Sequence, residues 1–173
     1  MPTPSLRPWR PERDATAVLA AFRASADLHR QAPPLVTIDD ARRYLAAIEG
    51  EALAIALDDE AVGCVMAAER DARHGTAWMS YWLAPAARGA GLASRALDTV
   101  STRLFADGFH RLELGARANN PASIAVAERA GFVREGVERE RLRYVDAHGR
   151  AERFDVVRLA RLASDPAPSL SPL

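Results

Sequence analysis

Residues 81–94 read Tyr81-Trp82-Leu83-Ala84-Pro85-Ala86-Ala87-Arg88-Gly89-Ala90-Gly91-Leu92-Ala93-Ser94, which places a glycine-bearing turn between an apolar strand and a helix. Glycine lets the backbone approach a ligand closely, and the first N–H groups of the helix have no partner within it. These donors and the positive end of the helix dipole suit a phosphate or diphosphate. Arg88 adds a positive charge at the rim of the turn. A turn of this kind can also be purely structural, so its meaning depends on the rest of the chain.

Two other phosphate-binding loops can be tested on the sequence. A P-loop needs Gly-Lys-Ser or Gly-Lys-Thr, and the chain contains no lysine, which excludes that signature. A dinucleotide-binding Rossmann loop needs a third glycine and an early strand–turn–helix unit, whereas this turn comes in the middle of the chain after an apparent hairpin. The Rossmann interpretation is therefore weak.

Hydrophobic periodicity predicts the elements around this turn. The sequence Asp58-Asp59-Glu60 predicts a hairpin turn, residues 29–36 a loop, and His148-Gly149 the last turn. The expected helices begin near residue 13 and cover 37–48, 91–106 and 121–130; the expected strands cover 6–9, 52–57, 61–68, 76–83, 111–117, 133–144 and 154–162. This order predicts an α+β fold with a mostly antiparallel, mixed sheet of six to seven strands, about four helices, and strand–helix–strand crossovers in its second half.

Composition bounds the class of protein. A chain of 173 residues is long enough for one domain, which we expect over residues 1–163, with a Pro/Ser-rich, disordered tail over residues 164–173. Apolar residues make up 49% and charged residues 27%, which is typical of a soluble protein. Basic and acidic residues balance at 23 each, so there is no general drive toward nucleic acid or a membrane surface.

The N-terminal sequence Met1-Pro2-Thr3-Pro4 does not have the pattern of a signal peptide, so we expect a cytoplasmic protein. The only cysteine, Cys64, lies in an apolar run and is expected to be a core residue rather than a catalytic thiol. The spacing of the four histidines and Cys64 is not that of metal ligands, so no metal is expected. Trp9, Trp78 and Trp82 could form a ligand cage, but aromatic residues on strands are more often core.

Two motifs together resemble one family. Residues 88–93, Arg-Gly-Ala-Gly-Leu-Ala, resemble the Arg/Gln-x-x-Gly-x-Gly/Ala signature of GNAT acetyltransferases. Residues 119–136, from Asn119 to Gly136, are similar to the Asn-x-x-Ser … Gly-Phe-x-x-Glu-Gly block of the RimJ/RimL branch, which includes the ribosomal-protein alanine N-acetyltransferases. The opening sequence from Leu6 to Pro11 also resembles this branch, so the likeness covers about residues 6–162.

The resemblance implies the GNAT fold, with acetyl-CoA as the acyl donor in a gap between strands 76–83 and 111–117. It implies that the backbone of the loop holds the coenzyme A diphosphate, that Trp82 and Leu83 flank the thioester, and that Asn120 contacts the pantetheine arm. Asn120 also suits a helix N-cap before Pro121, and both roles can hold at once. The cofactor-binding residues implied are Trp82, Leu83, Arg88, Gly89, Ala90, Gly91, Leu92, Ala93, Ser94 and Asn120.

The general acid and base are less well defined. Many family members carry a tyrosine acid seven residues after the asparagine, where this chain has Ala127; the RimL-like serine of Asn-x-x-Ser matches Ser123, which is also an ordinary first-turn residue. A glutamate found in relatives is replaced by Gly115, and Leu142 lies near the position of the RimL-like glutamate. Substitute bases are Glu113, Glu138, Glu140, His29 or a water chain.

The resemblance implies transfer of acetyl from acetyl-CoA to a primary amine, with a protein N-terminal amine as one acceptor. The alternatives are a small-molecule amine acetyltransferase or a non-catalytic acyl-CoA-binding module that kept the loop and lost the acid and base. The acceptor side is expected at His29 to Val36 and at the start of the following helix. The protein could be a monomer or a homodimer.

Overall fold

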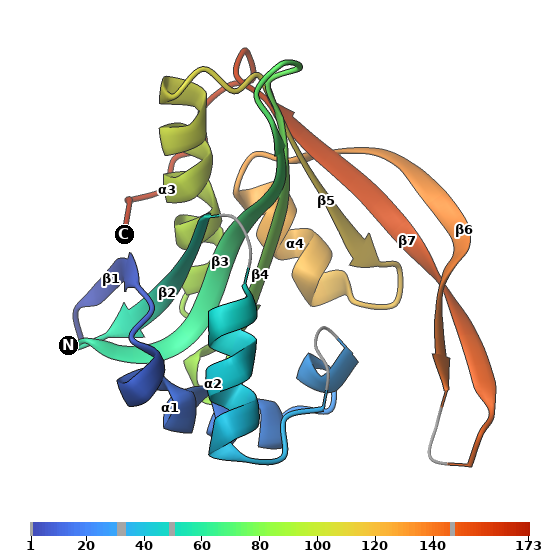
Figure 1. The fold of residues 1–173 in the computed structure, drawn as a ribbon. Helices are drawn as coiled ribbons and strands as arrows, with labels where there is room; N and C mark the ends of the chain where they lie inside the picture. The colour runs from blue at the N-terminus through green and yellow to red at the C-terminus, as the bar shows by residue number, and fades with distance from the viewer. Residues whose placement is uncertain (1, 31–33, 49–50, 146–147) are drawn as a thin grey trace.

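A computed structural model describes residues 2–30, 34–48, 51–145 and 148–173. Seven strands form one sheet in the order β1-β2-β3-β4-β5-β7-β6 (Figure 1). Among the strand pairs of these described residues, only β4–β5 is parallel, which confirms the predicted mixed and mostly antiparallel sheet. The strands are β1 (Pro4–Pro8), β2 (Glu51–Leu57), β3 (Glu60–Asp71), β4 (Thr76–Leu83), β5 (Arg111–Arg117), β6 (Val133–Val145) and β7 (Ala151–Leu162).

Helices cover both faces of the sheet. The α-helices are α1 (Pro11–Arg23), α2 (Ile38–Ala47), α3 (Leu92–Ala106) and α4 (Pro121–Arg129), with short 3-10 turns η1 (Leu28–Arg30) and η2 (Pro85–Ala87). One buried cluster joins the sheet to α3 and α4, and includes Met79. A second cluster joins the other face to α1 and α2, and includes Cys64 and Trp82. Because successive residues of a strand point to opposite faces, β4 is apolar on both sides, as its sequence predicts.

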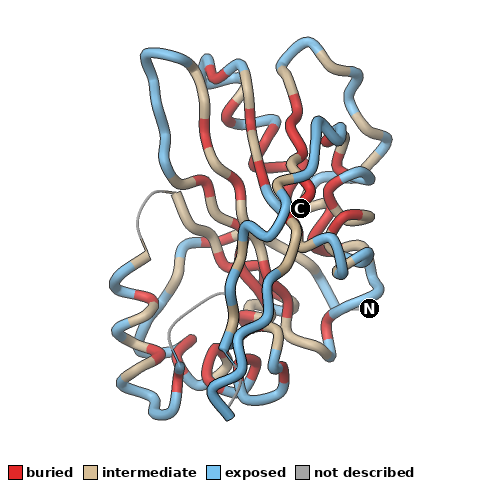
Figure 2. Tube along the Cα trace, turned by 90° about the vertical axis from the view of Figure 1, so that its right-hand side faces the viewer, coloured by how far each residue is buried: buried red, intermediate tan, exposed pale blue. Residues whose placement is uncertain are grey.

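The hairpin predicted at Asp58-Asp59-Glu60 is present. Asp58 and Asp59 adopt positive φ angles of 47° and 68°, which a tight two-residue hairpin turn requires. Buried side chains concentrate on the inner strands and on the helix faces that pack against them, whereas β6 is exposed along almost its whole length (Figure 2). The long β6–β7 hairpin therefore extends beyond the core.

β4 and β5 separate soon after they begin. Their parallel pairing covers only Thr76 to Trp78 against Arg111 to Glu113, although β5 continues to pair with β7 up to Arg117. Figure 1 shows the two strands diverging beyond this point, with α4 beside the gap. The core of the fold thus leaves a split in the sheet next to the start of α3.

The ends of several helices and strands differ from those expected from the sequence. β1 covers Pro4–Pro8 rather than 6–9, and α1 begins at Pro11 rather than near residue 13, because proline fits the first position of a helix. β7 begins at Ala151 rather than 154 because it pairs with the far end of β6.

The tail over residues 164–173, expected to be disordered, lies against α3. Arg95 of α3 donates hydrogen bonds to the carbonyl oxygens of Ser171 at 2.8 Å and Pro172 at 3.1 Å. The amide of Leu173 donates to Thr99 Oγ1 at 3.0 Å, and the Leu173 side chain packs on the apolar core. These contacts give the tail a defined path that its Pro/Ser composition does not predict.

Candidate functional site

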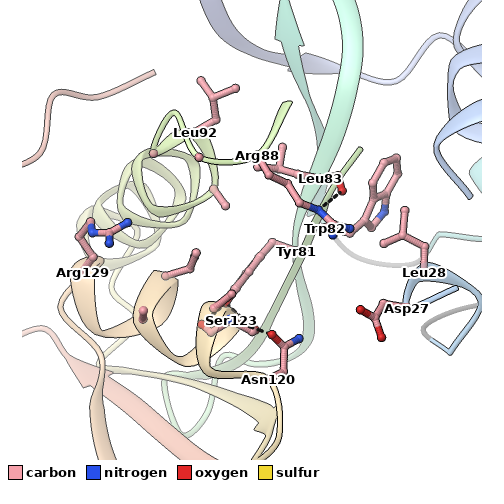
Figure 3. Close-up of a pocket in the computed structure, with 16 residues that line it drawn as sticks. Asp27, Leu28, Tyr81, Trp82, Leu83, Arg88, Leu92, Asn120, Ser123 and Arg129 are labelled. Atoms are coloured by element: carbon pink, nitrogen blue, oxygen red, sulfur yellow. Dashed lines mark hydrogen bonds between the residues drawn. The ribbon is translucent and has the colours of Figure 1, made fainter. Parts of the chain in front are cut away.

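A cavity of about 320 Å³ opens where β4 and β5 diverge. Figure 3 shows its lining side chains converging from β4, from the turn before α3, from α4 and from the segment that joins α1 to η1. Of the residues predicted to bind a cofactor, eight line the cavity: Trp82, Leu83, Arg88, Gly89, Gly91, Leu92, Ala93 and Asn120. Ser123, the predicted acid, lines it too, so one cavity brings together residues from two separate motifs.

The turn before α3 leaves its backbone donors available. Gly91 is the N-cap of α3 in a left-handed conformation, with φ of 72° and no side-chain capping bond. Gly89 also has a positive φ of 87°, and a Cβ atom built on either glycine would have no protein atom within 4 Å. The first amides of a helix have no partner within it, so the cavity-lining residues Gly91, Leu92 and Ala93 are the backbone donors that could hold an anion there.

Three of the residues predicted to bind the cofactor do not direct a free side chain into the cavity. The Arg88 guanidinium folds back onto β4, where Nε donates to the Leu83 carbonyl at 3.2 Å and Nη2 to Ser25 Oγ at 3.3 Å. Ser94 is fully buried and donates to the Val126 carbonyl at 3.1 Å. Neither Ser94 nor Ala90 belongs to the cavity lining, so any contribution of Ala90 would come through the backbone of the turn.

Asn120 and Ser123 meet Tyr81 at the side of the cavity formed by α4. Asn120 Oδ1 accepts a hydrogen bond from the Ser123 backbone amide at 3.1 Å, so Asn120 is the N-cap of α4. The side-chain nitrogen of Asn120, Nδ2, forms no hydrogen bond within the described residues. The Tyr81 hydroxyl donates to the Ser123 carbonyl at 2.7 Å and lies 2.9 Å from Ser123 Oγ. Burial raises the pKa of Tyr81 to about 12, an effect that the Ser123 contact partly offsets.

None of the predicted substitute bases lines this cavity. Glu113 pairs with Arg111 at 2.8 Å, and Glu138 lies 3.8 Å from Arg158, away from the cavity. Glu140 accepts a hydrogen bond from Arg153 at its carbonyl oxygen and is exposed, and His29 lines a second cavity.

The position of the missing family glutamate is filled by other side chains. A Cβ atom on Gly115 would lie 2.9 Å from Val156 Cγ1 and 3.4 Å from the Trp78 ring. The Arg158 guanidinium lies over that ring, 4.3 Å from its centre. This position on β5 is therefore occupied by valine and tryptophan side chains rather than by an acid, and it lies outside the lining of the main cavity.

Trp82 is buried in the second core cluster and half-buried Trp9 packs against that cluster, whereas Trp78 is half-buried and belongs to neither core cluster. Trp9 stacks on Trp82 at 6.2 Å between ring centres, and Trp82 Nε1 donates to the Tyr44 hydroxyl at 3.1 Å. Only Trp82 lines the cavity; Trp9 and Trp78 do not, so they form no cage around it.

A second cavity of about 530 Å³ lies between η1 and the far end of the β6–β7 hairpin. His29, Arg30, Tyr144, Arg150 and Glu152 contribute to its lining. The expected acceptor loop, His29 to Val36, borders this region in part, and its residues 31–33 lie outside the described residues.

Several residues of the main cavity were not predicted from the sequence: Asp27, Leu28, Tyr81, Ala122, Ala125, Val126 and Arg129. Asp27 is the only acid in the described lining, and its Oδ1 accepts from Arg117 at 2.7 Å and Arg30 at 3.1 Å. Arg129, in the last turn of α4, forms no ion pair within the described part of the chain. Of these residues, Tyr81 alone had a sequence signal for a role in the site, because it lies two residues before the end of an apolar strand.

Cys64 is buried, and burial raises its thiol pKa to about 12, as expected for a core residue rather than a nucleophile. Within the described residues, no group of three or more His, Cys, Asp or Glu side chains could hold a metal ion. No described helix has both the length and the apolar character needed to cross a membrane.

The chain belongs to the acetyltransferase (GNAT) domain family, whose model matches residues 5–133. It is 30% identical over 120 residues to YdaF of Bacillus subtilis (strain 168), which is named as a candidate ribosomal N-acetyltransferase. That match covers 69% of this chain and 63% of YdaF, so the chain spans less than two thirds of this relative.

Solved structures share the fold. RimJ of Mycobacterium smegmatis, in complex with CoA-disulfide, superposes with a TM-score of 0.75 at 27% identity over 92% of this chain and 82% of RimJ. An acetyltransferase that modifies the N-terminal serine of the ribosomal protein L7/L12 from Salmonella typhimurium has a TM-score of 0.78 at 21% identity, over 92% of this chain and 95% of its own. The GNAT fold and the likeness to the RimJ/RimL branch predicted from the sequence are confirmed.

Proposed function

We propose that this protein transfers the acetyl group of acetyl-CoA to a primary amine, and that the acceptor is a protein N-terminal amine. One observation carries the proposal: the uncapped start of α3 and the hydroxyl of Ser123 line the same cavity, beside a split in the sheet. An anion-binding helix start next to a proton donor is what an acyl transfer from a diphosphate-bearing thioester needs.

The described residues fit the acyl donor. The turn Arg88 to Gly91 presents backbone amides to the diphosphate, and its glycines leave room for close approach. The unbonded amide nitrogen of Asn120 is available to a carbonyl oxygen of the pantetheine arm. Arg129 supplies a positive charge at the rim, a role that the sequence assigned to Arg88.

The chemistry requires an uncharged amine, which attacks the acetyl carbon, and a proton for the sulfur that leaves. Ser123 is the donor of that proton in this proposal. The only carboxylate in the described lining, Asp27, is already engaged by the guanidinium groups of Arg117 and Arg30. We therefore assign the deprotonation of the amine to solvent, which reaches the cavity through its open side.

The acceptor reaches the cavity from the side of η1 and the β6–β7 hairpin, where the second cavity offers room for the residues that follow an N-terminus. YdaF and the L7/L12-modifying enzyme carry names that refer to the ribosome, which supports a protein N-terminus over a free small amine. A cytoplasmic location belongs to the same proposal, because ribosomal proteins are made there.

The test is an acceptor screen with acetyl-CoA, read as free thiol and confirmed by the mass of the acetylated product. We expect thiol release above background with peptides that begin in alanine or serine, and slower release with polyamines of equal concentration. The opposite order would favour the small-molecule alternative. Acetyl-CoA binding without turnover on any amine would support a non-catalytic module and contradict the proposal.

A further inference from the structure

The contact between Tyr81 and Ser123 joins two segments that no motif connects. Tyr81 lies on β4 and Ser123 in the first turn of α4, 42 residues further along the chain. The tyrosine hydroxyl reaches both the carbonyl oxygen and the Oγ of Ser123, and both residues line the main cavity (Figure 3). Two hydroxyl groups at hydrogen-bond distance can pass a proton from one to the other.

We propose that Tyr81 is a positioning residue that supplies the proton which Ser123 delivers to the leaving sulfur. This inference rests on the proposed acetyl transfer and goes beyond it, because it assigns the ultimate proton source. Ala127, further along α4, is buried and carries no proton donor. The hydroxyl that reaches Ser123 comes instead from Tyr81 on β4.

The hydrogen-bond geometry allows two arrangements of the protons. A phenol has one proton, and a carbonyl oxygen can only accept. In the first arrangement Tyr81 donates to the Ser123 carbonyl at 2.7 Å, and Ser123 Oγ donates to Tyr81. In the second, Tyr81 donates to Ser123 Oγ at 2.9 Å, which frees the serine proton for the cavity. Rotation of both hydroxyl groups, each about its own C–O bond, interconverts the two arrangements.

The relay solves a mismatch in acidity. A serine hydroxyl is a much weaker acid than a phenol, so Ser123 alone would become an unstable alkoxide when it protonates a thiolate. If Ser123 gains the Tyr81 proton as it loses its own, the negative charge passes to the phenol oxygen. Burial holds the pKa of Tyr81 at about 12, which keeps it protonated and ready at neutral pH.

The protons and bonds of the transfer balance. The amine nitrogen bonds to the acetyl carbon, the carbon–sulfur bond breaks, and its electron pair goes to sulfur. Ser123 Oγ donates its proton to sulfur and receives the proton of Tyr81. Nitrogen loses one proton to solvent on becoming an amide, and solvent returns one proton to Tyr81, so both residues end as they began.

The experiment compares four variants for thiol release with an N-terminal alanine peptide: Tyr81→Phe, Ser123→Ala, the double variant, and Tyr44→Phe as a control. Tyr44 is a second buried tyrosine whose pKa burial raises to about 12, and its hydroxyl contacts Trp82 rather than Ser123. It is outside the cavity lining. All four variants are first checked for cooperative thermal unfolding.

We expect Tyr81→Phe and Ser123→Ala each to lower kcat about 10- to 100-fold, within the range of general acid catalysis, with the KM for acetyl-CoA changed less than about threefold. The double variant should be about as slow as the slower single variant, because both act in one relay. Tyr44→Phe should stay within about threefold of the wild type.

A kcat for Tyr81→Phe equal to the wild type, or losses that multiply in the double variant, would overturn the relay while leaving acetyl transfer intact. A wild-type protein that turns over no amine would overturn both. If Tyr81→Phe does not fold, a fluorinated tyrosine placed at position 81 keeps the shape and changes the acidity of the phenol. The relay then requires kcat to change with that acidity, and an unchanged kcat contradicts it.

Discussion

Replacing Gly91 by glutamate tests the anion-binding turn directly. The glycine is the uncapped N-cap of α3, and a Cβ atom there would meet no protein atom within 4 Å, so the new side chain enters the cavity without a clash. A glutamate side chain there can bring its carboxylate to within about 7 Å of a diphosphate held by the amides of this turn. At an effective dielectric constant of about 20, each pair of unit charges at that distance repels by about 2 kcal/mol.

Two kcal/mol corresponds to a loss of about 30-fold in affinity for acetyl-CoA, and the bulk of the side chain adds to it. The positive φ of 72° costs roughly 1 kcal/mol of folding free energy for a residue with a side chain. The favourable position of an acid at a helix N-terminus offsets part of that cost. We therefore expect a folded protein whose thermal midpoint falls by a few degrees at most.

Binding is measured by titration calorimetry with acetyl-CoA, with two control variants. Gly91→Gln has nearly the same bulk without the charge, and the gap between Gln and Glu should shrink as salt is added. Gly108→Glu carries the same charge at the other end of α3, where φ is 94° and the space is equally open. An affinity for Gly91→Glu equal to the wild type, or an equal loss in Gly108→Glu, would refute the assignment of the diphosphate to this turn.

Three further substitutions or modifications have definite expected outcomes. Gly115→Glu places an acid where some relatives carry a glutamate, and it should not raise kcat. It should lower the free energy of unfolding, measured by denaturant titration, by about 1–3 kcal/mol, because the Trp78 ring lies 3.4 Å from the new Cβ. Asp98→Asn keeps an acceptor oxygen but removes the negative charge that balances buried Arg161 at 2.7 Å, which should cost about 3–5 kcal/mol and lower the thermal midpoint by about 10 °C; a shift below about 3 °C would show that the charge pair is dispensable. Burial raises the pKa of Cys64 to about 12, so the neutral thiol should persist as the pH rises from 7 to 9, and alkylation by iodoacetamide should stay slow across that range until denaturant is added; rapid labelling of the native protein would contradict this.

Local sequence signals predicted the parts of the fold that depend on neighbouring residues. The apolar run of β4, the glycine turn and the start of α3 are adjacent in the chain, so their order alone places a helix start at the end of a buried strand. The Asp58-Asp59 turn and the N-cap role of Asn120 follow from the preferences of single residues. Each of these features is present in the structure.

Features that depend on distant contacts were not predicted. The meeting of Tyr81 with Ser123 joins residues 42 positions apart, and the bond from Arg88 to Ser25 joins residues 63 positions apart. A motif fixes the type of a residue, whereas the direction of its side chain depends on packing. The path of the tail is a further case, because the arginine that contacts it lies on α3, 76 residues before Ser171.

In the proposed function, the uncapped start of α3 holds the diphosphate of coenzyme A. Calorimetric titration of the wild-type protein with acetyl-CoA and with S-acetylpantetheine, which has the same thioester and no diphosphate, measures that contribution directly. We expect acetyl-CoA to bind at least about 100-fold more tightly, since several charge-assisted hydrogen bonds to the backbone are lost in the shorter ligand. Equal affinities for the two thioesters would contradict the claim.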